Sequence, residues 1–144
     1  MTSDGVITGL EGKEETPADD GKAAPRGRNR DTGIGGESLA AGYLMSKGLR
    51  ILARNYRVVQ GELDIVAMDG QVLVFCEVKT RRGIGFGPPE CAVTPWKQRQ
   101  MRRAAEAYLY CHGLRDQECR FDVVAVLLHD GTHDITHFKN AFYF

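Results

Sequence analysis

The chain has 144 residues, 42% of them hydrophobic and 26% charged, and its 19 basic residues balance its 19 acidic ones. This size suits one compact domain and excludes a second domain of similar size. The longest apolar run, Val123 to Leu128, is far shorter than the roughly 18 residues of a membrane-spanning helix. Residues 1–30 also lack the apolar stretch of a secretory signal. We therefore expect a soluble cytoplasmic protein without a membrane partner.

The N-terminal part divides into a leader and a first helix. Residues 1–32 contain few large apolar side chains and no repeating pattern. Such a segment buries too little surface to offset its ordering entropy, which predicts a flexible leader. The folded domain is expected over 33–144. Within it, apolar residues at helical spacing predict a helix over 37–47, ended by Gly48 as its C-cap.

Three strands are expected next. Residues 49–58 have the partial alternation of a strand, and the runs 62–68 and 71–80 are rich in β-forming residues. The last two runs flank Asp69-Gly70, a strong turn signal for a β-hairpin.

The second half begins with a loop rich in Gly and Pro over 82–89. Thr94-Pro95 is typical of a helix N-cap followed by Pro at the first helical position, and this helix is expected to run to about residue 112. Strands over 120–128 and 134–144 follow. The order α-β-β-β-α-β-β predicts an α/β fold.

The expected hairpin indicates which side chains share a face of the sheet. If Asp69 and Gly70 are its two loop residues, Asp64 lies opposite Phe75. Because paired residues share a face and side chains alternate along a strand, the two faces differ in chemistry. One face would carry Glu62, Asp64, Phe75, Glu77 and Lys79, and the other the apolar residues Leu63, Ile65, Ala67, Val72, Val74, Cys76 and Val78. Asp64 and Glu77 would be diagonal neighbours about 7–8 Å apart.

Two carboxylates and a lysine beside strongly apolar strands call for a counter-charge, because buried like charges repel. A divalent cation supplies one, and oxygen ligands favour Mg²⁺ or Mn²⁺. We expect Asp64 and Glu77 to bind this metal, and Lys79 to orient a nucleophile or neutralise developing charge in phosphodiester hydrolysis. The alternative is a solvated outer hairpin face with ordinary surface charges.

A third acid and a basic region accompany this cluster. Glu37 lies on the inward stripe of its helix, either as a third acid of the site or as a favourable charge near a helix N-terminus. From Lys79 to Arg103 there are seven basic residues and one acidic residue, which suggests an anionic ligand such as nucleic acid; a solvated helix face is the alternative. The candidate contacts to nucleic acid are Arg81, Arg82, Lys97, Arg99, Arg102 and Arg103.

The histidines at 129, 133 and 137 recur every four residues, as zinc ligands on a helix would. The turn signal Asp130-Gly131 and the apolar residues that follow favour strands instead, which disfavours a zinc site.

Several short motifs in 33–144 occur together. They are Gly36-Glu37, Leu52-Ala53-Arg54-Asn55-Tyr56-Arg57, Gly61-Glu62-Leu63-Asp64-Ile65-Val66-Ala67, Val74-Phe75-Cys76-Glu77-Val78-Lys79-Thr80-Arg81 and Lys97. In combination they closely resemble the YraN family of bacterial proteins, regarded as endonuclease-like members of the PD-(D/E)xK superfamily, which includes archaeal Holliday-junction resolvases.

The resemblance implies a restriction-endonuclease-like core, a mixed β-sheet flanked by helices. It implies Asp64 and Glu77 as metal ligands, Lys79 as the catalytic lysine and Glu37 as the helix-borne acid. Resolvase-like enzymes commonly act as dimers because junctions have two-fold symmetry, so a homodimer is compatible with it.

We therefore expect a Mg²⁺- or Mn²⁺-dependent endonuclease acting on DNA, including branched or single-stranded intermediates. A nucleic-acid-binding module of the same fold without useful hydrolysis is the first alternative. An adaptor whose basic helix binds an acidic protein surface is the second.

Overall fold

A computed structural model describes residues 27–83 and 93–143. The leader predicted for 1–32 therefore lies outside the described residues up to residue 26, whereas 27–32 are part of a helix. Most of the predicted Gly- and Pro-rich loop also lies outside them. In the described part of the chain, no helix has the length and apolar character needed to cross a lipid bilayer.

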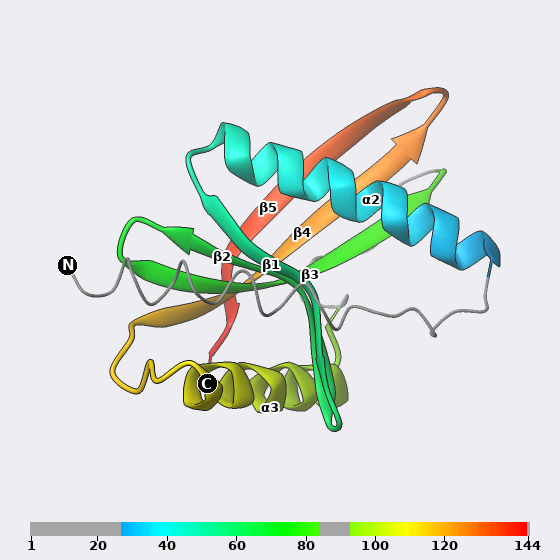
Figure 1. Ribbon diagram of the computed structural model, residues 1–144. Helices are drawn as coiled ribbons and strands as arrows, with labels where there is room; N and C mark the ends of the chain where they lie inside the picture. Colours follow the sequence, from blue (N-terminus) through cyan, green and yellow to red (C-terminus); the bar gives the residue numbers. More distant parts are fainter. Residues whose placement is uncertain (1–26, 84–92, 144) are drawn as a thin grey trace.

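The described residues form two helices and five strands in the predicted order α-β-β-β-α-β-β (Figure 1). The elements are α2 (Gly27–Ser46), β1 (Arg50–Val58), β2 (Gly61–Asp69), β3 (Val72–Arg82), α3 (Pro95–Cys111), β4 (Cys119–His129) and β5 (Thr132–Phe142). The main difference from the prediction is that α2 begins at Gly27 instead of Glu37.

The end of α2 and the start of α3 carry the local signals that the sequence predicts. Gly48 follows α2 with φ of 95°, the left-handed conformation that favours glycine after a helix. At the start of α3, the Thr94 side chain accepts a hydrogen bond from the Lys97 amide at 3.1 Å, and Pro95 occupies the first turn. Both predicted caps are confirmed.

The five strands form one mixed sheet in the order β1-β2-β3-β4-β5. Neighbours pair antiparallel except β3 and β4, which are parallel. A parallel pair needs a long crossover connection, and α3 lies in this connection. The predicted α/β fold with a mixed sheet flanked by helices is confirmed.

Each face of the sheet is covered by one helix (Figure 1). On one face, Met101, Ala104 and Tyr108 of α3 pack with Phe75 and Phe121. On the other face, an apolar cluster joins α2 to the sheet; it contains Ala40, Ala41, Leu44, Ile65, Ala67, Val74, Cys76, Val124 and Val126. Both faces of the central strands are therefore buried, which explains their nearly continuous apolar runs.

The β2–β3 turn lies one residue later than predicted. Asp69 pairs with Val72, so Gly70 and Gln71 form the loop. Gly70 has φ of 64°, and glycine at the first loop position is the pattern of a type II′ turn. The predicted Asp-Gly loop would have required a positive φ at Asp69, whose carboxylate instead lies 2.9 Å from Arg120 Nη2.

Candidate active site

The candidate site lies where β2 and β3 separate. Their paired register ends at Ile65 and Cys76. Just beyond this point the main chain of β3 takes a side-chain partner: the Val78 amide, two residues after Cys76, donates a 2.8 Å hydrogen bond to Asp64 Oδ2. Asp64 thereby fills the position of a strand partner, and its carboxylate is fixed between the two strands.

Glu77 lies next to Asp64 and is buried, with a side chain only 6% exposed. Burial raises its pKa to about 8, reinforced by the negative charge of Asp64 and opposed by Lys97 and Lys79. Burial also raises the pKa of Asp64, against the hydrogen bond from Val78. The interaction between the two side chains lowers the pKa of Asp64 and raises that of Glu77, so a cation bound between them would compete with protons.

One oxygen of Glu77 is left unsatisfied. Glu77 Oε1 is buried and has no hydrogen-bond partner among the described residues; Lys97 Nζ lies 3.6 Å away, beyond an ordinary N–H···O bond. Buried oxygens normally have partners. An orphaned carboxylate oxygen beside a second carboxylate fits an oxygen-binding cation such as Mg²⁺ or Mn²⁺.

Glu37 approaches the pair from α2. Burial raises its pKa to about 7, with a further increase from Asp64 and a decrease from Arg54. Arg54 Nη2 lies 4.0 Å from Glu37 Oε1, and Asn55 makes a side-chain hydrogen bond to Glu37. Asn55 is left-handed within β1, with φ of 54°, a conformation that Asn tolerates better than most residues. These two neighbours are functional candidates that sequence reasoning missed.

Two lysines flank Glu77. Lys79 Nζ is 3.9 Å from Glu77 Oε2, and its side chain is partly exposed. Lys97 reaches the cluster from the first turn of α3. Burial lowers the pKa of Lys97, but the carboxylates of Glu77, Asp64 and Glu62 outweigh this and raise it overall. The cluster thus joins Asp64, Glu77, Lys79 and Lys97, with Glu37 in electrostatic contact.

Two details of the predicted hairpin geometry are wrong: the face of Leu63, and the diagonal relation of Asp64 to Glu77. Leu63 packs with Phe75 and the α3 side of the core instead of on the opposite face, because β2 loses strict alternation where it leaves β3. The burial of Glu77 also argues against a solvated outer hairpin face. Asp64 and Glu77 are also not diagonal neighbours as predicted. Continuing the observed register of β2 and β3 would set Asp64 directly opposite Glu77.

The arrangement does not form a complete metal cage. Among the residues that the structure describes, no three His, Cys, Asp or Glu side chains are grouped closely enough to hold a metal ion. Two carboxylates and open coordination positions suit Mg²⁺, which keeps several water ligands. Glu37 therefore remains a candidate acid beside the pair instead of a third ligand.

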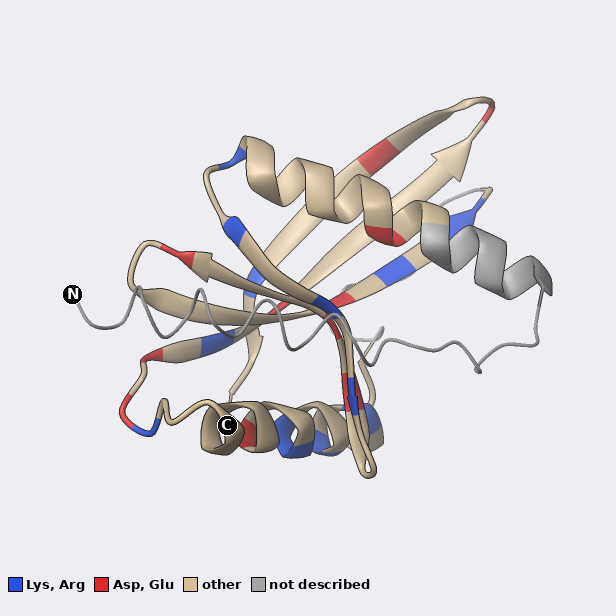
Figure 2. Ribbon diagram, viewed as in Figure 1, with Lys and Arg blue, Asp and Glu red and all other residues tan. Residues whose placement is uncertain are grey.

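The six predicted nucleic-acid contacts do not share one environment. Figure 2 shows basic residues along the end of β3 and along α3. Arg81, Arg82, Arg99 and Arg103 are exposed. Lys97 belongs to the acidic cluster, and Arg102 has a packing role: its Nε donates to Tyr143 O at 2.9 Å and its guanidinium lies over Phe142.

A second buried carboxylate, Asp122 on β4, escaped the sequence analysis. It accepts hydrogen bonds from Arg120 Nε at 2.9 Å and from the Asn140 amide at 3.0 Å, and His137 Nε2 lies 2.7 Å away. His137 thus pairs with an acid of the neighbouring strand. The available signal was an Asp inside an apolar strand run, close to a histidine-bearing strand.

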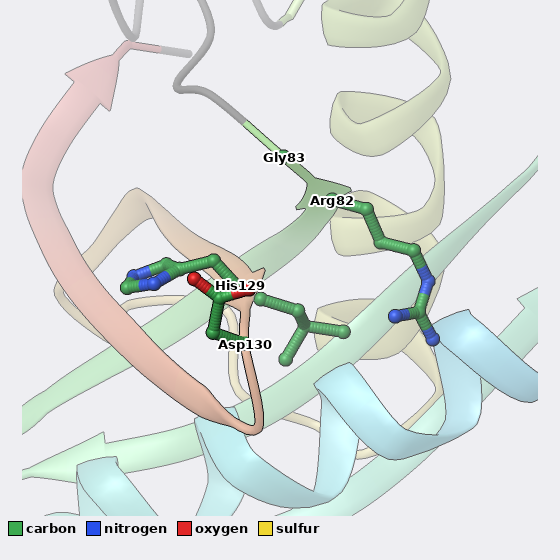
Figure 3. A pocket seen from close by; sticks show the side chains of 5 residues that line it. Arg82, Gly83, His129 and Asp130 are labelled. Atoms are coloured by element: carbon green, nitrogen blue, oxygen red, sulfur yellow. The ribbon is translucent and has the colours of Figure 1, made fainter.

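An open hollow of about 420 Å³ lies away from this chemistry, at the end of the β4–β5 hairpin. It is lined by Arg82, Gly83, Leu128, His129 and Asp130. In Figure 3 the Arg82 side chain points away from His129 and Asp130. The lining groups therefore do not converge on a common point, and the acidic cluster remains the candidate site.

Comparisons with known proteins agree with the motifs. The profile of the uncharacterised protein family UPF0102 matches residues 36–126. A UPF0102 protein of Pelobacter propionicus is 49% identical over 135 residues, covering 92% of this chain and 94% of that protein. One from Geobacter sulfurreducens is 51% identical over 115 residues, covering 79% and 90%. With a matched profile and relatives of this similarity, the chain belongs to the UPF0102 family, the YraN family that its motifs indicate.

Proposed function

We propose that this protein is a metal-dependent endonuclease that hydrolyses phosphodiester bonds in DNA, including branched or single-stranded intermediates. The observation that carries the proposal is the buried Glu77 Oε1 without a hydrogen-bond partner among the described residues, next to Asp64 and two lysines. A structural ion pair would be satisfied within the fold. A site that binds a cation and a phosphate, in contrast, needs a carboxylate oxygen that is not already occupied by a hydrogen bond within the fold.

Asp64 and Glu77 are the residues that would hold Mg²⁺ or Mn²⁺. When bound, such a cation polarises the phosphate and lowers the pKa of water. Lys79, 3.9 Å from Glu77 Oε2, orients the attacking water and neutralises charge that develops on the phosphate. Glu37, with a pKa raised to about 7 by burial, is suited to accept a proton near neutral pH.

The exposed arginines have a different role. Arg81, Arg82, Arg99 and Arg103 would contact the phosphate backbone and not the bases, because an arginine on a phosphate carries no sequence information. Binding should therefore weaken steeply with salt, as expected when counterions are released from DNA.

The test is cleavage of labelled single-stranded, flap and four-way-junction DNA with Mg²⁺ or Mn²⁺. Wild type, Glu77→Gln and Lys79→Met are compared with Glu106→Gln, which alters an exposed acid on α3. We expect cleavage in wild type and Glu106→Gln, and its loss in the two site variants. Binding is recorded on the same substrates by fluorescence anisotropy.

Salt-sensitive binding without cleavage under either metal would replace the nuclease with a nucleic-acid-binding module. Absence of both binding and cleavage would contradict the proposal altogether and favour an adaptor role. Cleavage that persists unchanged in Glu77→Gln would indicate a contaminating nuclease.

A further inference from the structure

The ammonium group of Lys97 lies between two carboxylates of different character. It is 3.6 Å from Glu77 Oε1 and 3.9 Å from Glu62 Oε2. Neither distance is that of a formed N–H···O hydrogen bond. The Glu77 side chain is 6% exposed, whereas that of Glu62 is 43% exposed. Lys97 is therefore shared between a buried carboxylate and a solvated one, without being committed to either.

Glu62 is held in place by the β1–β2 hairpin. Its Oε1 lies 3.3 Å from Nε of Arg57, the residue directly opposite it in the antiparallel register. The neighbouring Gly61 lies against the backbone of α3, where a Cβ would collide with the Gln100 carbonyl oxygen. The carboxylate thus stays within reach of Lys97 while the lysine stem, with four rotatable carbons, is free to adjust.

The position of Lys97 conflicts with a divalent cation on Glu77. The ammonium lies beside the one buried oxygen of Glu77 that lacks a hydrogen-bond partner among the described residues, and this is the oxygen available to a metal. Two positive groups on one carboxylate oxygen repel strongly where water is excluded. The ammonium has to move for the cation to bind, and a shift of about 1 Å toward Glu62 would complete a hydrogen bond there.

We propose that Lys97 is a built-in counter-ion that occupies the divalent cation's place beside Glu77, and that Glu62 is the positioning residue that receives the ammonium when the cation binds. This rests on the proposed function only in the assignment of Asp64 and Glu77 as the cation site. It gives Glu62 a role that is distinct from metal ligation, and it explains why a partly exposed acid adjoins the cluster.

The proposal makes opposite predictions for the two partners. Removing Lys97 removes a competitor, so cation affinity should rise. Removing the charge of Glu62 leaves the ammonium with Glu77 as its carboxylate partner, so cation affinity should fall. A loosened fold would instead weaken binding in both variants, and a general effect of lost positive charge would appear in a lysine variant far from the cluster as well.

The experiment is titration of the full chain with Mn²⁺, without nucleic acid, by isothermal calorimetry. The variants are Lys97→Gln, Glu62→Gln and the conservative Glu62→Asp, with Lys47→Gln as a charge-matched control at an exposed position on the other helix side of the sheet. We expect about tenfold tighter binding in Lys97→Gln and several-fold weaker binding in Glu62→Gln. Glu62→Asp should recover most of the wild-type affinity, and Lys47→Gln should match wild type.

Equal or weaker Mn²⁺ binding in a folded Lys97→Gln overturns the proposal, as does unchanged binding in Glu62→Gln, which remains decisive if Lys97→Gln does not fold. Wild-type binding that is lost in Glu77→Gln but insensitive to residues 62 and 97 would overturn this proposal while leaving the cation site intact. Absence of Mn²⁺ binding in both wild type and Lys97→Gln would overturn the cation site itself.

Discussion

Two buried carboxylates on neighbouring strands have opposite environments. Glu77 on β3 and Asp122 on β4 are one step apart in register, since Cys76 pairs with Asp122 and Glu77 with Val123. They face opposite sides of the sheet. Arg120, His137 and the Asn140 amide surround Asp122, whereas Glu77 retains an oxygen without a hydrogen-bond partner among the described residues.

Their pKa values shift in opposite directions. Burial raises the pKa of Asp122, but hydrogen bonds from His137, Arg120 and Asn140 outweigh it, so its pKa is lowered overall. Burial raises the pKa of Glu77 to about 8. A carboxylate with a structural role is ionised, and hydrogen bonds satisfy its oxygens. A carboxylate that serves an external ligand lacks some of these bonds, so its ionised form is disfavoured in the absence of the ligand. The contrast separates structural acids from functional ones better than burial does.

The largest expected effect is on the structural side. Asp122→Asn removes the charge that Arg120 and His137 share in a buried site, and breaking such a network typically costs about 3–5 kcal/mol. We expect the free energy of unfolding, measured by urea denaturation, to fall by about 3 kcal/mol. A loss below about 1 kcal/mol would remove the basis of the comparison.

Glu77→Gln should behave in the opposite way. It removes a charge that burial disfavours, so stability at pH 9 should be equal to or higher than that of wild type. Metal-dependent cleavage should fall at least about 100-fold, because a ligand of the proposed cation is lost. Thermal melts and cleavage rates, measured on the same samples, check the two halves of this prediction. If Glu77→Gln were less stable than wild type, Glu77 would be a structural acid like Asp122.

The pH dependence of stability should have opposite signs for the two regions. The raised pKa values of Glu77 and Glu37, about 8 and about 7 from a usual 4.5, mean that the folded state binds more protons between pH 4.5 and 8. The contribution of Glu37 and Glu77 to the free energy of unfolding is therefore fully present below pH 4.5 and is lost as the pH rises through 7 and 8. The lowered pKa of Asp122 has the reverse effect: its contribution is present above pH 3.8 and is lost on further acidification.

Urea denaturation of the metal-free chain from pH 3 to 9 measures both effects. The double variant Glu37→Gln/Glu77→Gln should flatten the decline above pH 5 and leave the acid limb unchanged. Mn²⁺ should restore stability most at the alkaline end, where the carboxylates are ionised. If stability still declined above pH 5 in the double variant, the decline would come from other titratable groups.

The smallest expected effect extends the comparison to the basic residues. Arg102 binds Tyr143 O and lies over Phe142, so Arg102→Ala should lower the free energy of unfolding by about 1 kcal/mol. Exposed Arg103 should change stability by less than about 0.5 kcal/mol. Arg103→Ala should instead reduce the salt dependence of DNA binding by about one phosphate contact. Equal stability losses in the two variants would erase the distinction.

Much of the fold could be predicted from local sequence signals. Gly48, Thr94-Pro95 and Asp130-Gly131 punctuate the chain with residues whose backbone preferences are strong, and the structure has a helix end, a helix start and a turn at these positions. The β2–β3 turn was harder, because Asp69-Gly70 and Gly70-Gln71 are both acceptable loops. Only the tertiary contact between Asp69 and Arg120 distinguishes them.

The acidic cluster could be predicted in composition but not in arrangement. Period-2 alternation identifies Asp64, Glu77 and Lys79 as neighbours, yet it does not reveal where β2 and β3 separate. The Asp122 network depends on a register shift in the β4–β5 pair, with Asn140 at φ of 55°. Such irregularities arise from long-range packing, which a pattern along one chain does not encode.

The hydrogen bond from the Val78 amide to Asp64 Oδ2 provides a spectroscopic reporter. In an ordinary ladder this amide would bond to a neutral carbonyl and be insensitive to titration. Bonded to a carboxylate, its ¹H and ¹⁵N resonances will move when Asp64 gains a proton or binds a metal ion, and its exchange with solvent will change as well. One backbone signal, assigned once, therefore reports the occupancy of the site in solution without any label on a functional side chain.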